Sequence, residues 1–197
     1  MRQAITVADH GNGDGDDLQC GGGVEGERYK IWPLAKLPDG SYSVPDFVLL
    51  RIWDDIFADG RYKSLFYNGG VKTPFDWMAW IKSPANFPVL VVDTMQRKVV
   101  CIAWINNAVD GAAMAHFCML GLPRVEIGKA VLQYWSGVDG LKVLVGFTPE
   151  SNTGAVKYAK KIGFVESGYI PMMCNMVHEG RRVGAVVTTY LTHQEEG

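Results

Sequence analysis

The sequence predicts an α/β fold in which helices cover both faces of a central, twisted, mixed β-sheet. Two observations carry this prediction: two amphipathic helical segments come first, and strand-like runs then form a meander followed by strand–helix–strand units. A third is the composition, since 48% of the 197 residues are hydrophobic and 11% are aromatic. That content is ample for a buried core in one domain of ordinary size.

The helical part begins after Pro45. Residues Asp46 to Ala58 place large apolar side chains near helical spacing, and the Asp59-Gly60 pair predicts the end of that helix. Thr73-Pro74 predicts the start of a second helix, with a good N-cap residue followed by Pro at the first helical position. Pro84 marks its end.

The remaining elements follow from alternating apolar runs and turn residues. Six strands are expected besides two further helices, and Gly163 is a predicted helix C-cap. The expected strands are Pro88 to Asp93, Lys98 to Asn106, Ala112 to Leu120, Leu141 to Phe147, Phe164 to Val177 and, as the last of the sheet, Val183 to Leu191, while the helices are Val125 to Trp135 and Asn152 to Ile162.

Residues 1–45 are predicted to be a Gly/Asp-rich, partly flexible extension of a domain that spans residues 46–197. His10 to Glu27 carries no hydrophobic period. The acidic stretch from Asn12 to Asp17 fails as an EF-hand loop, because its sixth position is Asp rather than Gly and its twelfth is Gly23 rather than Glu. We expect a surface loop there, and a strand or clip over Tyr29 to Leu37.

Charge and cysteine content exclude several classes of function. A net charge of -2 gives no overall field for nucleic acid or anionic lipid, and no apolar run is long enough to span a membrane. The N-terminus lacks the apolar core of a secretory signal. The four cysteines form no CxxC pair and have no histidine at metal spacing. We therefore expect a cytoplasmic protein with reduced thiols, no metal, no nucleic acid and no membrane partner.

One segment has the offsets of a known motif. Asn152-Thr-Gly-Ala155 leads into a helix that ends at Gly163-Phe164, so Ala comes three residues after Asn and Gly-Phe eleven and twelve after it. With a strand before and after, this resembles the Asn-x-x-Ala...Gly-Phe signature of the GNAT (GCN5-related N-acetyltransferase) superfamily. The order of elements also resembles that of this family, including divergent and phage-type members, which implies the GNAT-like acyl-CoA N-acyltransferase fold.

A second segment is similar to the family's phosphate-binding loop, Arg/Gln-x-x-Gly-x-Gly/Ala. Gly128 and Ala130 match its last two positions, whereas Val125 stands at the Arg/Gln position. Glu126 brings a negative charge into the loop, which Lys129 partly offsets. Backbone N–H groups at a helix N-terminus hold pyrophosphate well. The resemblance thus implies acetyl-CoA as co-substrate, bound by Met119, Leu120, Val125, Gly128, Lys129, Ala130 and Asn152.

The resemblance also implies roles in chemistry. In the family the strands corresponding to Ala112 to Leu120 and Leu141 to Phe147 splay apart and admit the pantetheine arm. His116 is the best-placed base for the attacking amine. The family's acid, a Tyr seven residues after the Asn, falls on Ala159, and Tyr158 lies about 100° away on the helix. His116 and Tyr158 are thus the candidate catalytic residues, each with a core role as its alternative, and Asp54 and Asp55 are candidate contacts for a cationic substrate.

The expected function is transfer of an acetyl group from acetyl-CoA to an amine on a small molecule or protein. Two alternatives stay open: a catalytically silent GNAT-like module of the phage virion type, acting in structure or interaction, and a regulatory domain that binds CoA. The altered loop and the missing Tyr favour the silent module. GNAT domains often pair through their last strands, so a homodimer through Val183 to Leu191 is also expected.

Overall fold

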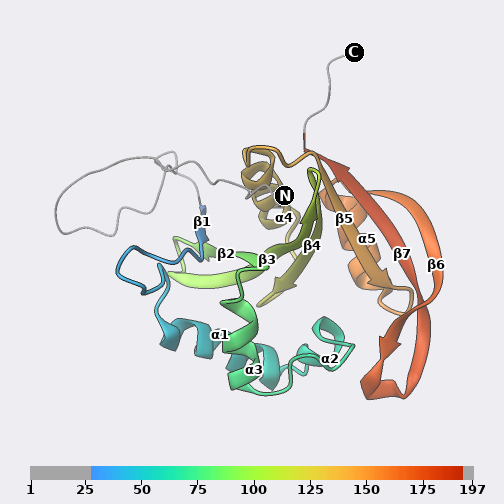
Figure 1. Ribbon diagram of the computed structural model, residues 1–197, viewed down its shortest axis with the longest axis horizontal. Helices are drawn as coiled ribbons and strands as arrows, with labels where there is room; N and C mark the ends of the chain where they lie inside the picture. The colour runs from blue at the N-terminus through green and yellow to red at the C-terminus, as the bar shows by residue number, and fades with distance from the viewer. Residues whose placement is uncertain (1–27, 193–197) are drawn as a thin grey trace, which may run out of the picture.

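A computed structural model describes residues 28–192 of the chain (Figure 1). Its helices are α1 (Asp46–Ala58), α2 (Tyr62–Leu65), α3 (Pro74–Ile81), α4 (Val125–Ser136) and α5 (Thr153–Ile162), with a 3-10 turn η1 (Val177–Glu179). Its strands are β1 (Tyr29–Pro33), β2 (Asn86–Asp93), β3 (Lys98–Val109), β4 (Ala112–Met119), β5 (Val143–Pro149), β6 (Val165–Met176) and β7 (Arg181–Leu191).

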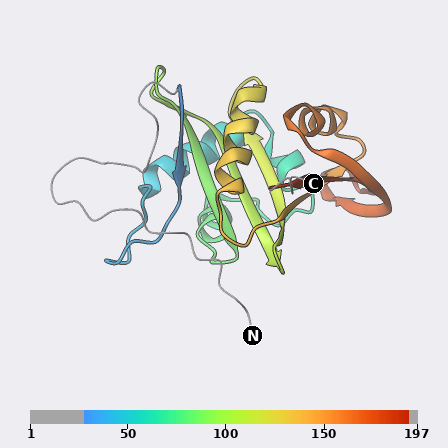
Figure 2. The ribbon, with the colours of Figure 1, turned by 90° about the horizontal axis from the view of Figure 1, so that it is seen from above.

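All seven strands belong to one mixed sheet, ordered β1-β2-β3-β4-β5-β7-β6. Every neighbouring pair is antiparallel except β4 and β5, which run parallel. Helices cover both faces, as Figure 2 shows from above. One apolar cluster joins α4 and α5 to the sheet through residues such as Val131 and Ile162, and a second joins α1 and α3 through Ile56 and Trp77. The predicted mixed sheet with helices on both faces is therefore confirmed.

Most predicted elements are present with boundaries within a few residues. The exceptions concern short or marginal segments. The one-turn helix α2 was not predicted, since four residues carry no periodic pattern. The strand expected within Tyr29 to Leu37 is confirmed as β1, which pairs with β2 and so brings part of the predicted extension into the sheet. The acidic stretch from Asn12 to Asp17 lies outside the described residues.

The homodimer expected through Val183 to Leu191 stays a prediction, but it would not form by pairing along an edge of this strand. This segment lies in β7, which pairs with β5 on one side and with β6 on the other. Both of its edges are therefore occupied. The edge strand on this side of the sheet is β6, where Val165, Tyr169 and Met172 are exposed. Because apolar residues are typical of both inner strands and interfaces, the sequence alone does not separate the two.

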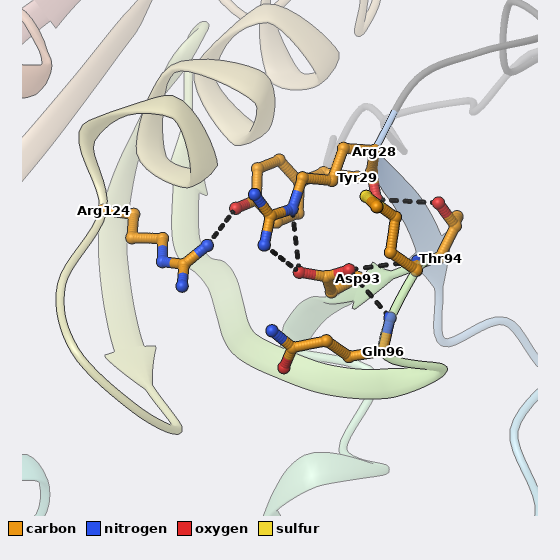
Figure 3. Close-up of polar contacts among 7 residues, drawn as sticks. Arg28, Tyr29, Asp93, Thr94, Gln96 and Arg124 are labelled. Carbon is orange, nitrogen blue, oxygen red and sulfur yellow. Dashed lines mark hydrogen bonds and ion pairs between the residues drawn. The ribbon is translucent and has the colours of Figure 1, made fainter.

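The first strand is tied to the rest of the sheet and to α4 by polar contacts (Figure 3). The Arg28 guanidinium pairs with the buried Asp93 carboxylate through Nε and Nη2, each at 3.0 Å. Burial alone would raise the pKa of Asp93, but the N–H of Gln96, the Arg28 guanidinium and the N–H of Met95 together lower it. The Arg124 guanidinium donates to the Tyr29 hydroxyl at 2.9 Å. The strand β1 thus braces the residue that precedes α4.

The helix α3 begins with a complete capping box. The Thr73 hydroxyl accepts from the Asp76 N–H at 3.1 Å, and the Asp76 carboxylate accepts from the Thr73 N–H at 3.0 Å. The helix is then held against α1, because the buried Trp77 indole donates to the Leu49 carbonyl at 2.9 Å. None of the helices in residues 28–192 is long and apolar enough to cross a membrane.

We predict that Thr73→Ala lowers the free energy of unfolding by about 1 kcal/mol, because it leaves a helical N–H without its acceptor. Urea unfolding followed by circular dichroism measures this change. Thr73→Ser is the matched control, since it keeps the hydroxyl and should stay close to the wild type. Equal losses in both variants would show that the methyl group, not the cap, stabilises this turn.

Candidate functional site

The parallel strands β4 and β5 are hydrogen-bonded over a short stretch only. Their register joins Ala112 to Val143, Ala113 to Leu144 and Met114 to Val145, and no later pair exists within the described chain. The strands part beyond Met114, while β4 stays paired with β3 as far as Met119. The sheet therefore contains a wedge-shaped gap between two strands that both continue.

A cavity of about 240 Å³ occupies this gap and reaches both faces of the sheet. On one face it is lined by residues of α5 and its N-cap, and on the other by residues in and around α2. Its lining comprises Arg61, Ser64, Leu65, Tyr67, Ala115, His116, Phe117, Cys118, Met119, Gly146, Phe147, Thr148, Pro149, Asn152, Ala155, Tyr158, Ala159, Ile162, Phe164 and Thr188. A molecule in this cavity would contact groups on both sides of the sheet.

The edge of β4 that faces the cavity carries main-chain groups without a strand partner. The Leu120 N–H donates to the Val100 carbonyl at 2.9 Å, so Leu120 faces β3. By alternation the N–H and C=O groups of Phe117 and Met119 face the gap. The Arg61 guanidinium donates to the Met119 carbonyl. This edge could accept an extended ligand in the way that a sheet accepts an additional strand.

His116 lies on β4 with its ring in the cavity lining. The ring stacks on Trp104 at 5.0 Å between centroids, and Nε2 lies 3.2 Å from the Asn106 side-chain oxygen. Burial lowers the pKa of His116 to about 4, so the imidazole is neutral at pH 7.

The tautomer of His116 follows from the hydrogen bonds behind it. The Asn86 amide donates to the Trp80 carbonyl at 2.7 Å, so its oxygen is left to accept from the Asn106 amide at 3.3 Å. With its amide nitrogen directed at Asn86, Asn106 turns its side-chain oxygen toward His116. An oxygen can only accept, so the Nε2 atom of His116 must carry the proton. The Nδ1 atom of His116 is consequently the unprotonated nitrogen.

Tyr158 contributes its ring to the cavity, but its hydroxyl is engaged at the start of α4. It donates to the Arg124 carbonyl at 2.9 Å and accepts from the Gly128 N–H. Burial raises the pKa of Tyr158, so the group stays protonated. Ala159 also lines the cavity, at the position where the resemblance implies an acid.

The first turn of α4 lies against α5. A Cβ atom added at Gly128 would lie 2.6 Å from Ile162 Cγ2 and 2.6 Å from the Tyr158 hydroxyl, so any side chain there would push the helices apart. The helix N-cap, Arg124, makes no side-chain capping hydrogen bond. Within residues 28–192, no side chain accepts from the first N–H groups of α4, which is the arrangement that binds anions. Lys129 is exposed on this turn, and Glu126 is exposed beside it.

The predicted site residues divide into two groups. His116, Met119, Asn152 and Tyr158 all line the cavity. Asn152 also caps α5, accepting from the Ala155 N–H at 3.2 Å. Val125, Gly128, Lys129 and Ala130 instead form the first turns of α4, while the Leu120 side chain is buried against α1 and α3.

Sequence reasoning missed the part of the site that comes from α2. Arg61, Ser64 and Tyr67 line the cavity, and Tyr67 also lines a second cavity of about 310 Å³ beside it. These residues follow the predicted end of the first helix in a polar segment. Nothing in that local pattern indicates that the segment packs against the sheet. Asp54 and Asp55, the candidate contacts for a cationic substrate, line neither cavity.

The cavity thiol is not an activated nucleophile. Burial raises the pKa of Cys118 to about 12, and the Arg61 guanidinium only partly opposes this rise. Within residues 28–192 no three His, Cys, Asp or Glu side chains gather in a way that would hold a metal ion.

Comparison with known proteins gives a likeness in structure only. The sequence matches no protein-family model and no curated protein. The structure is similar to spermidine N-acetyltransferase from Vibrio cholerae in complex with CoA and spermine, with a TM-score of 0.64 and 14% identity over 84% of this chain and 96% of that one.

Two further solved structures share the fold. Ribosomal-protein-S5-alanine acetyltransferase from Vibrio fischeri has a TM-score of 0.59 and 14% identity over 88% of this chain and 98% of that one. RimJ from Mycobacterium smegmatis, in complex with CoA-disulfide, has a TM-score of 0.62 and 13% identity over 78% and 82%. The chain therefore has the GNAT acetyltransferase fold, as its motifs predicted.

We predict that His116 makes the protein acid-sensitive. The pKa of His116 is about 4 in the folded state, below its ordinary value of 6.5, so the unfolded state binds the proton more tightly. Stability from this group is complete above pH 6.5 and falls as the pH drops toward 4. Relative to His116→Gln, the wild type should lose about 3 kcal/mol more of unfolding free energy between neutral pH and about pH 4.

Urea titrations of both proteins across this range measure the difference, because all other titratable groups are the same in the two proteins. Parallel pH profiles would mean that His116 has the same pKa in the folded and unfolded states, as a solvated imidazole would.

Proposed function

We propose that this protein is an N-acetyltransferase that moves an acetyl group from acetyl-CoA to the amine of an acceptor. The observation that carries the proposal is the cavity at the parted strands β4 and β5, which opens on both faces of the sheet. Such a passage allows a donor to enter from the side of α4 and α5 and an acceptor from the side of α2. The likeness in fold to N-acetyltransferases supports it.

The residues on the donor side fit acyl-CoA. The N–H and C=O groups of Phe117 and the N–H of Met119 suit the amides of a pantetheine arm, while the Met119 carbonyl already accepts from Arg61. The uncapped N-terminus of α4 suits the pyrophosphate, with Lys129 exposed on the same turn. Glu126 opposes this attraction. Gly128 serves the site indirectly, because its missing side chain lets α5 pack closely against this turn.

The chain's own groups supply positioning and a proton acceptor. Bound acetyl-CoA supplies a thioester, whose carbon–sulfur bond breaks as the new carbon–nitrogen bond forms. His116, neutral and with Nδ1 unprotonated, accepts a hydrogen bond or proton from the acceptor amine. Its depressed pKa makes it a weak base, so it favours an amine that arrives already deprotonated. The main chain of β4 fixes the donor's end of the cavity.

A catalytically silent module with the same fold is the second reading. Ala159 at the position of the family's acid favours it, because no hydroxyl stands there. Acyl-CoA binding separates the enzyme and a CoA-binding regulator from this reading, and turnover separates the enzyme from the regulator.

We predict that excess acetyl-CoA raises the melting temperature, since a ligand at 100 times its dissociation constant stabilises the folded state by about 2.7 kcal/mol. Lys129→Glu should weaken binding, and Glu126→Gln should strengthen it, each by about two- to fivefold through the charge at the helix N-terminus. Differential scanning fluorimetry over a range of acetyl-CoA concentrations gives the dissociation constants.

Lys36→Glu makes the same charge change on an exposed lysine that lines neither cavity, and should leave binding unchanged. If acetyl-CoA does not raise the melting temperature of the wild type, the proposal that this protein is an acetyltransferase is refuted. Equal effects of Lys129→Glu and Lys36→Glu would place the phosphates elsewhere.

The role of Tyr158 is tested by Tyr158→Phe. If the hydroxyl holds the start of α4, as its bonds to Arg124 and Gly128 indicate, the change weakens acetyl-CoA binding severalfold with a smaller effect on kcat. If it is the acid that protonates the leaving thiolate, kcat falls about 100-fold or more while binding is unchanged. Thiol release with a saturating amine, measured beside the melting shift, distinguishes the two.

A further inference from the structure

The charges that line the acceptor side of the cavity differ from those expected for a polyamine acceptor. Among the described residues lining the main cavity, Arg61 is the one charged side chain, and no carboxylate is present. A polycationic acceptor would bring unpaired positive charges to a partly enclosed site that already holds a guanidinium. Desolvating such charges without a carboxylate is unfavourable.

Arg61 is placed to bind an anion at the centre of the site. Its guanidinium donates to the Met119 carbonyl, so it lies at the edge of β4 that faces the gap. A second nitrogen pairs with Asp59 at 2.6 Å. Of the five N–H donors on a guanidinium, these contacts leave several for a ligand, and the planar fork matches a carboxylate or phosphate.

The adjoining cavity adds a second positive charge. It shares Ser64 and Tyr67 with the main cavity and is also lined by Lys63 and Glu179. Glu179 is paired with Arg181 at 2.7 Å, whereas the Lys63 ammonium lies over the Tyr62 ring and forms no ion pair within the described chain. Both carboxylates near α2, Asp59 and Glu179, are therefore paired with arginines, and the charge of Lys63 is left in excess.

Accepting the proposed function, on which this step rests, we propose that the acceptor amine also carries an anionic group, a carboxylate or a phosphate, held by Arg61 and Lys63. The donor occupies the side of α4 and α5, so the acceptor meets the residues of α2 as it enters. The anionic group fixes the acceptor's orientation, and its amine points toward β4 and His116.

Matched pairs of amines test this proposal. Phosphoethanolamine against ethanolamine tests a phosphate, β-alanine against propylamine tests a carboxylate, and spermidine tests a polycation. Thiol release from acetyl-CoA gives kcat/KM for each. The wild type should prefer the anionic member of at least one pair, and the preferred pair identifies the anion.

Charge variants of Lys63 assign the preference to this surface. Lys63→Met should raise the KM of the anionic amine about two- to fivefold, and Lys63→Glu should raise it further, with ethanolamine and propylamine little affected. Lys36→Glu is the charge-matched control. Arg61→Lys keeps the positive charge but loses the two parallel N–H donors of the guanidinium. It should therefore weaken binding of the anionic amine more than binding of the neutral one. Melting temperatures confirm that each variant folds.

Calorimetry of the same amines binding to the CoA-saturated protein separates this inference from the proposed activity. Charge-selective binding without turnover would leave the inference standing and count against catalysis. Binding that favours spermidine, or that ignores the anionic group, would overturn the inference even if acetyl transfer occurs. An unchanged preference in Lys63→Glu and Arg61→Lys would overturn the assignment to these residues.

Discussion

The site depends on one interruption in the sheet, where β4 and β5 stop pairing after Met114. Parallel strands normally continue their hydrogen bonds as long as both run, because unpaired main-chain groups inside a protein are costly. Here both strands run on, and the cost is met on one side by the Arg61 guanidinium, which takes the Met119 carbonyl. Helix α5 on one face of the sheet and α2 on the other supply the remaining side chains that line the gap.

The two helical layers act on the gap in different ways. On one face α5 closes against the first turn of α4 at Gly128, and the Tyr158 hydroxyl bridges that turn. This packing fixes the first turn of α4 against α5. On the other face α2 and the loop after it bring Arg61 and Tyr67 to the sheet. We propose that the donor enters on the side of α5 and the acceptor on the side of α2.

The core on the α1 and α3 face of the sheet also sets the orientation and protonation of His116. Trp104 stacks on His116, and the amides of Asn106 and Asn86 relay its orientation from the Trp80 carbonyl. Burial keeps the imidazole neutral, so the group can accept a proton but holds it weakly. A site of this kind depends on position more than on basicity. The same burial that orients His116 also makes it a source of acid sensitivity.

The sequence by itself determined the elements, the mixed sheet and the likeness to acyltransferases. These depend on local signals: apolar periodicity, the Thr73 cap, the Gly163 turn and the offsets between Asn152 and Phe164. Such signals are readable because they act within a few residues of one another. The candidate site was predictable to the same extent, through residues on β4 and α5 such as His116 and Asn152.

Only the tertiary structure decided which of these groups meet, and what surrounds them. The return of Arg61 to β4, the occupation of both edges of β7 and the close packing at Gly128 join residues far apart in the chain. The positions of these residues in the sequence do not indicate that they are in contact. The absence of a carboxylate from the described cavity lining is likewise a property of the folded surface, because carboxylates are common in the sequence but end elsewhere.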